Sequence, residues 1–128
     1  MKTLRRFWFF ASLLATWFSS SVQGQTTIVI RDTEAIEHPG QYVTVEGTVV
    51  AVFTSSSGNT FLSFGAAYPH QTFGGWILQD SELARGSTLA GLADLAGKKL
   101  RITGTIELYR GKPAIRISSM KQIQQDEY

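Results

Sequence analysis

The chain has 128 residues and a formal net charge of +2, and hydrophobic residues make up 43% of it, which suits one globular domain with a modest core. It contains no cysteine, which excludes disulfides, thiolate metal sites and cysteine catalysis. The fold must therefore be held together by packing alone.

The first 24 residues have the three parts of a secretory signal peptide. Three basic residues open the chain, an apolar run extends from Phe7 to Phe18, and a small polar stretch ends at Gly24. The apolar run is about half the roughly 20 residues that a membrane-spanning helix needs, which disfavours the alternative of a permanent anchor. We expect cleavage near Gln25, a single mature domain over residues 25–128, no membrane span after cleavage, and a periplasmic or secreted location.

Loss of the leader would change the net charge of the protein. Three of the 12 Lys and Arg residues lie within the leader, so the mature chain has nine basic and ten acidic residues, a net charge of −1. Residues 25–97 carry a net charge of −5, and residues 98–121 carry +6. The basic surface that is typical of nucleic-acid binders is therefore expected only in the last part of the chain.

The predicted elements begin with a short helix over Asp32–His38, which Asp32 would cap and Pro39-Gly40 would end. Alternating apolar and polar residues over Gln41–Phe53 then predict an unusually long first strand, with Phe53 on its apolar face. Gly47, in the middle of this strand, predicts a bulge or sharp bend that lets one strand serve both sides of a small barrel.

Four more strands and one more helix are predicted after the first strand. The strands are expected over Thr60–Gly65, Thr72–Gln79, Lys98–Leu108 and Ala114–Met120. The helix is expected from about Ser87 to Ala96, between the third and fourth strands. The Gln-rich, acidic tail over Gln122–Tyr128 is expected to be frayed.

This order of elements, β-β-β-α-β-β, describes an all-β domain with one or two short helices and resembles the OB-fold, a five-stranded, partly open barrel that binds oligonucleotides and oligosaccharides. Tyr42–Val49 (YVTVEGTV) and Leu100–Ile106 (LRITGTI) are similar to the first and fourth strands of nucleic-acid-binding OB-fold domains of the tRNA-anticodon type. Ser57–Gly65, followed by Tyr68-Pro69, is similar to a bacterial subgroup that also occurs near secreted nuclease-like domains. The resemblance covers about Ile28 to Ile123.

The resemblance implies a ligand cleft on the face of strands two and three, flanked by the loops Thr54–Asn59 and Tyr109–Pro113. In the second loop, Tyr109, Arg110 and Lys112 place an aromatic ring beside two cations, a combination that can stack a base and contact its phosphate. The alternative is a solvated hairpin tip, because such tips are commonly polar whatever their function.

Two arginines could extend this basic surface along the barrel. Alternation places Arg101 and Arg116 on the outward faces of the fourth and fifth strands, beside the second loop of the implied cleft. Solvated strand faces explain both residues nearly as well.

Aromatic residues crowd the second and third strands, and one face cannot hold them all. Alternation points Phe61 and Phe64 to opposite faces, and likewise Phe73 and Trp76, so that some of these rings fill the core of the small barrel. Tyr68, which lies in a loop, and Trp76 are the aromatic residues expected to contact a ligand.

No catalytic or metal-binding pattern stands out in the sequence. His38 and His70 are the two histidines, and neither has a carboxylate or a second histidine at ligand spacing. The nucleophile elbow G-x-S-x-G and the phosphate loops G-x-x-x-x-G-K-S/T and G-x-G-x-x-G do not occur. We therefore expect no enzyme, no metal and no cofactor.

Three functions remain open at this point. The sequence favours an exported, non-catalytic module that binds single-stranded DNA or RNA through strands two and three and the loop from Tyr109 to Lys112. The second function is a binding module for a peptide, a glycan or a small ligand, since the net charge of −1 attracts polyanions only weakly over long distances. The third is a structural or assembly role, in which an open barrel edge pairs with a partner in the cell envelope.

Overall fold

The computed structural model describes residues 27–81 and 91–125. The predicted signal peptide and residues 87–90 of the predicted second helix lie outside these ranges. Within them, no helix has both the length and the apolar character needed to span a membrane.

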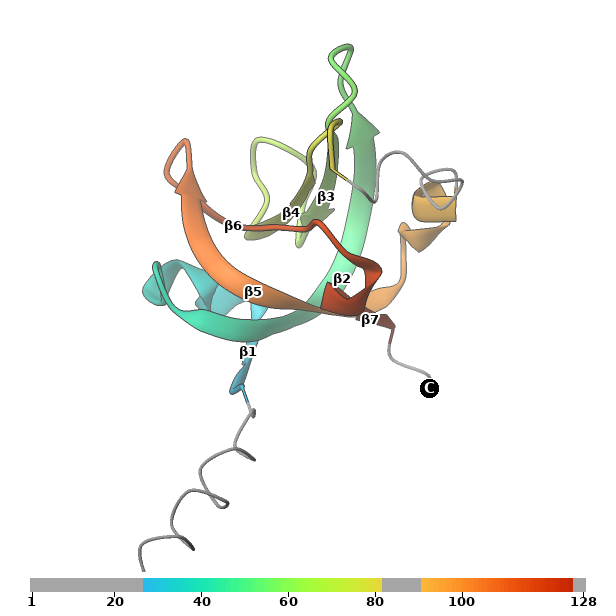
Figure 1. The fold of residues 1–128 in the computed structure, drawn as a ribbon. Helices are drawn as coiled ribbons and strands as arrows, with labels where there is room; N and C mark the ends of the chain where they lie inside the picture. Colours follow the sequence, from blue (N-terminus) through green and yellow to red (C-terminus); the bar gives the residue numbers. More distant parts are fainter. Residues whose placement is uncertain (1–26, 82–90, 126–128) are drawn as a thin grey trace, which may run out of the picture.

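Five strands form the barrel, and two shorter strands and three 3₁₀ helices are added to it (Figure 1). The barrel strands are β2 (Tyr42–Thr54), β3 (Thr60–Phe64), β4 (Phe73–Ile77), β5 (Lys99–Tyr109) and β6 (Lys112–Arg116). The added elements are β1 (Val29–Arg31), η2 (Asp32–Glu37), η3 (Leu92–Leu95), η4 (Met120–Gln122) and β7 (Ile123–Gln125).

The pairing of the barrel strands makes a complete circuit. β2 pairs with β3, β3 with β4, β4 with β6, β6 with β5, and β5 pairs again with β2. Every pair is antiparallel except β4 and β6, which are parallel. This is the strand order of the OB-fold, so the predicted fold class is confirmed.

The long strand β2 belongs to both sides of the barrel because it changes partner in its middle. Tyr42 to Thr48 pair with β5, whereas Val49 to Thr54 pair with β3. One extra residue, Val50, interrupts the register with β3, so the bulge lies there and not at Gly47, where a bulge or a sharp bend was predicted. Gly47 pairs in register with β5, and a Cβ there would lie 2.9 Å from the Asp32 carboxylate of η2.

The bulge also reverses which side chains of β2 face outward. Val43, Val45 and Val49 are buried, but after the extra residue Val52 packs against the core and Phe53 is 60% exposed. The simple alternation placed Phe53 on the apolar face with Val43, and the structure corrects this. One inserted residue moves every following side chain to the other face.

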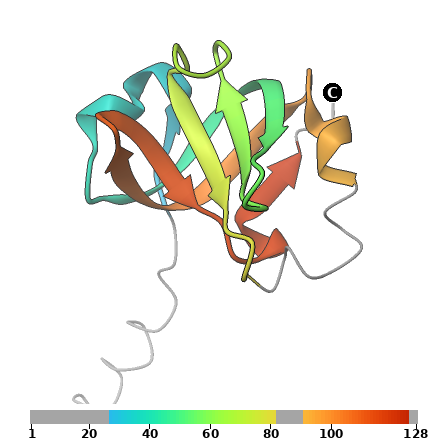
Figure 2. The same cartoon turned by 90° about the horizontal axis from the view of Figure 1, so that it is seen from above.

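Large aliphatic side chains and two phenylalanines fill the barrel. Phe64 and Phe73 pair across β3 and β4 and meet edge to face, with ring centroids 5.2 Å apart. The other fully buried large residues are Val43, Val45, Val49, Leu62, Ile77, Leu100, Ile102, Ile106, Ile115 and Ile117. η2 and η3 lie on opposite sides of the barrel and each adds a buried residue to this core, Ala35 and Leu92 (Figure 2).

The first predicted helix is present as the 3₁₀ helix η2, but its predicted cap is not. The Asp32 carboxylate accepts a hydrogen bond from the Thr72 hydroxyl instead, which ties η2 to the start of β4. Glu34 accepts a hydrogen bond from the backbone N–H of Arg31 at 2.9 Å, so this N–H group at the start of η2 has a partner.

The C-terminal segment is paired up to Gln125, in contrast to the expected fraying from Gln122. The Gln122 side chain accepts from the backbone N–H of Ser118 at 2.9 Å and donates to the carbonyls of Thr103 and Arg116 at 3.1 and 2.9 Å. These bonds hold the segment against the barrel, and β7 then pairs with Leu100 to Ile102 of β5.

Candidate ligand-binding cleft

Strand register places four large side chains in one row on the outward surface of the barrel. Phe53 of β2 pairs with Phe61 of β3, Phe61 pairs with Trp76 of β4, and Trp76 pairs with Arg116 of β6. Because directly paired residues point to the same face of a sheet, the row runs across four adjacent strands.

Two rings of this row, those of Phe61 and Trp76, form an aromatic cluster with Tyr109, which lies at the end of β5. Phe61 and Trp76 stack with centroids 6.0 Å apart and planes 14° apart. The Tyr109 ring lies 5.1 Å from Trp76 and 6.2 Å from Phe61. These contacts fix the rings on the strands before any ligand arrives, which lowers the entropy lost on binding.

Three cations border the aromatic cluster. The guanidinium carbon of Arg116 lies 5.4 Å from the centroid of Trp76, and that of Arg110 lies 5.4 Å from the centroid of Tyr109. Lys112 donates from Nζ to the backbone carbonyl of Gln71 at 3.4 Å. Arg116 also contacts the Glu107 carboxylate at 3.3 Å, so its charge is partly balanced.

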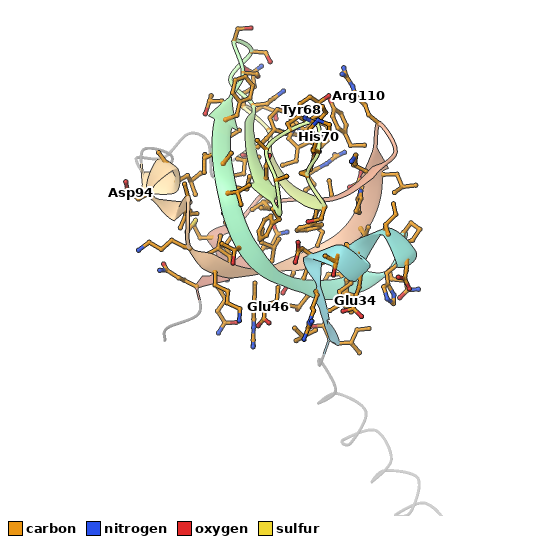
Figure 3. The ribbon with its side chains drawn as sticks, turned by 180° about the vertical axis from the view of Figure 1, so that it is seen from behind. Glu34, Glu46, Tyr68, His70, Asp94 and Arg110 are labelled. Atoms are coloured by element: carbon orange, nitrogen blue, oxygen red, sulfur yellow. The ribbon has the colours of Figure 1, made fainter. Side chains whose placement is uncertain are left out.

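The loop between β3 and β4 reaches over the cleft to the β5–β6 hairpin. Arg110 donates from Nη1 to the hydroxyl of Tyr68 at 3.2 Å, and Figure 3 shows the two side chains together. This hydrogen bond, and then the proximity of Tyr109, raise the pKa of Arg110 above its ordinary value. Arg110 therefore stays positively charged at every physiological pH.

The open part of the cleft has a volume of about 210 Å³ and lies between two tyrosines and the aromatic row. Its lining residues are Phe53, Phe61, Ser63, Tyr68 and Tyr109. It adjoins a smaller cavity of about 30 Å³, which Trp76 and Lys112 help to line. Among the described residues, no Asp or Glu lines either space.

Six of the seven residues predicted from the sequence come together at this cleft. They are Tyr68, Trp76, Tyr109, Arg110, Lys112 and Arg116.

Arg101, the seventh predicted residue, does not join the others. It pairs across the strands with Glu46, and its Nε lies 2.9 Å from the Glu46 carboxylate, which Lys99 also contacts at 3.9 Å. The cause is the curvature of β5, whose first half pairs with β2 and β7 and whose second half pairs with β6. In Figure 3, Glu46 lies at the opposite end of the barrel from Tyr68 and Arg110.

Two residues of the cleft were missed by the sequence analysis. Phe53 turns outward only because of the bulge, and Gln71 lines the smaller cavity while being 8% exposed. The loop Thr54–Asn59, which was expected to flank the cleft, lines neither space. The end of β2 takes its place through Phe53.

Neither His38 nor His70 lines the two spaces of the cleft. His38 contacts the Gln41 side chain through Nδ1 at 2.9 Å, and His70 is exposed in the β3–β4 loop. Across residues 27–81 and 91–125, no three His, Asp or Glu side chains gather as metal ligands would.

Comparisons with known proteins give low-identity structural likenesses. No family model matches the chain, and no curated protein does. Among solved structures, it is similar to an aspartyl-tRNA synthetase from Leishmania major Friedlin (8% identity over 82% of this chain, TM-score 0.49) and to one from Entamoeba histolytica (15% over 83%, 0.47). It is also similar to the second OB-fold domain of replication protein A from Methanococcus maripaludis (16% over 77%, 0.42). The chain spans 22% and 24% of the two synthetases and 97% of the replication protein A domain.

Proposed function

We propose that the chain is an exported, non-catalytic OB-fold protein that binds single-stranded nucleic acid in this cleft. The observation that carries the proposal is the row of rings on β2, β3 and β4 with cations along its β5–β6 side. Stacking of a base on an aromatic ring is worth about 1–3 kcal/mol, and neighbouring cations attract the phosphates. Rings and cations together fit a ligand that is both flat and anionic.

The position of the charges supports a nucleic acid over an uncharged ligand. Arg110, Lys112 and Arg116 all lie on the hairpin side of the row, whereas the loop Thr54–Asn59 on the other side has no charged residue. A nucleic-acid strand whose bases lie on the rings would place its sugar-phosphate backbone along the β5–β6 hairpin. The competing function, binding of a peptide, glycan or small ligand, uses the same rings without the cations.

The experiment that separates the two functions is a binding titration over a range of salt concentrations. Residues 25–128 contain every strand that the structure describes, and this segment is titrated with a labelled oligothymidylate of about 12 nucleotides. With three cations at the site, the slope of log K against log salt should be about −2, at roughly −0.7 per neutralised phosphate. A flat salt response, or binding only to glycans or peptides in parallel titrations, would contradict the proposal.

Export is tested separately on the full chain. When the chain is expressed in a bacterium, the protein recovered from the periplasm or medium should begin near Gln25, as read by N-terminal sequencing. A protein that keeps Met1 and stays in the cytoplasmic fraction would contradict this part of the proposal.

A further inference from the structure

A smaller cavity, which Tyr68 and Tyr109 help to line, adjoins the open part of the cleft. Its volume is about 30 Å³, compared with about 210 Å³ for the open part, and both tyrosines line both spaces. Three small residues that pair across β3, β4 and β6 line it, Ser63, Gly74 and Ala114. The cleft is therefore wider beside Phe53 and narrower beside Gly74 and Ala114.

Two residues that line the smaller cavity each have a buried polar atom without a partner. Oε1 of Gln71 and Nε1 of Trp76 are buried, and neither has a hydrogen-bond partner in the described part of the chain. Both residues line the cavity, and Gln71 is 8% exposed. Buried polar groups are almost always hydrogen-bonded in folded proteins, so an unpaired acceptor and an unpaired donor in one cavity indicate a polar group that enters it.

Two hydrogen bonds link the β3–β4 loop to the β5–β6 hairpin beside the cavity. Arg110 and Tyr68 make the first bond at 3.2 Å, and Lys112 and the Gln71 carbonyl make the second at 3.4 Å. A nucleic-acid strand lying on Phe53 and Phe61 therefore meets these bonds beside the tyrosines.

We infer that the site receives the end of a strand, with the edge of its terminal base at Gln71 Oε1 and Trp76 Nε1 and its phosphate at Arg110 and Lys112. This inference rests on the proposed function. The edge of a nucleobase carries both donors and acceptors, which matches the unpaired acceptor and donor. A space of about 30 Å³ holds little more than a water molecule, so the exposed Tyr68 side chain must swing outward and release Arg110 to admit a base. The bond between Lys112 and the Gln71 carbonyl still links the loop to the hairpin.

The test compares linear and covalently circular single strands of the same sequence and length. Residues 25–128 should bind the linear strand about five- to tenfold more tightly, the change expected for one or two hydrogen bonds that only an end can make. Equal affinity would overturn the inference and leave the proposed function standing. Failure of both strands to bind would overturn both.

A substitution at the floor of the cavity gives a second readout. A Cβ at Gly74 would make ordinary contacts, 3.6 Å to the Leu62 carbonyl and 4.0 Å to Ala114 Cβ, so Gly74→Ala should fold and fill the cavity. It should lower the affinity for the linear strand to that for the circle. The matched control is Gly91→Ala, where nothing lies within 4 Å of the added Cβ and the preference for ends should persist. An unchanged preference in Gly74→Ala, with an unchanged melting temperature, would overturn the inference.

Discussion

On the face formed by β1, β7 and the paired parts of β2 and β5, polar side chains are bonded to one another. On the face formed by β3, β4, β6 and the β5–β6 hairpin, two arginines lie against aromatic rings. On the first face, the hydroxyls of Thr27, Thr44 and Thr103 are linked at 2.8 and 2.7 Å, and Arg101 pairs with Glu46 at 2.9 Å. On the second face, the guanidinium groups of Arg110 and Arg116 lie over the rings of Tyr109 and Trp76.

The difference shows that a count of basic residues does not locate a binding site. The strongly basic segment 98–121 supplies cations to both faces. Glu46 pairs with both Lys99 and Arg101 on the first face, and Glu107 pairs with Arg116 on the second. A cation over a ring still presents its charge to an external anion, because the ring carries no net charge. The two faces can therefore be compared by matched substitutions.

The largest expected effect comes from removing an aromatic ring. Trp76→Ala should weaken oligonucleotide binding by about 1–3 kcal/mol, or roughly five- to 150-fold, since Trp76 contacts Phe61, Tyr109 and Arg116. Tyr42→Ala removes a ring that is 63% exposed on the other face and should leave binding unchanged. Fluorescence anisotropy measures both affinities, and an equal loss in the two variants would contradict the assignment of the cleft.

A smaller effect is expected from removing pairs of cations. The double substitution Arg110→Ala with Lys112→Ala should reduce the magnitude of the salt slope by about 1.4, since each lost phosphate contact on a single strand contributes roughly 0.7. The matched pair Lys99→Ala with Arg101→Ala should leave the slope as it is. If the second pair lowers the slope as much as the first, the attraction is a property of the whole barrel and not of the cleft.

The smallest expected effects are on stability. The variant that loses more stability should be the one that keeps its affinity for the oligonucleotide. Arg101→Ala should lower the free energy of unfolding by up to about 1 kcal/mol, because its pair with Glu46 is partly shielded from solvent. Arg116→Ala removes a more exposed pair and should cost less stability, yet weaken oligonucleotide binding. Urea denaturation measures the stability of both variants, and fluorescence anisotropy measures their affinity for the oligonucleotide. Loss of binding in Arg101→Ala would contradict the distinction between the two faces.

The sequence predicts the fold better than it predicts the site, for reasons that particular residues show. Alternation of apolar residues defines the five barrel strands to within a few residues, and it correctly opposes Phe61 to Phe64 and Phe73 to Trp76. The bulge at Val50 depends on how β2 pairs with β3, which periodicity does not contain.

The same limit explains the remaining differences in the fold and the cleft. The short strands β1 and β7 form by pairing with longer strands and have little pattern of their own. The position of Arg101 depends on the curvature of β5, and the position of Phe53 depends on the bulge. Local pattern therefore gives the elements, whereas tertiary pairing decides which side chains meet.

The fluorescence of Trp76 tests the central claim most directly. Trp8 and Trp17 lie in the predicted leader, so Trp76 is the single tryptophan of residues 25–128 and its emission reports on the cleft alone. If bases stack on the aromatic row, a short oligonucleotide should quench this emission saturably, and added salt should restore it. Emission that stays constant while an oligonucleotide is added to saturation would contradict the claim that single-stranded nucleic acid binds in this cleft.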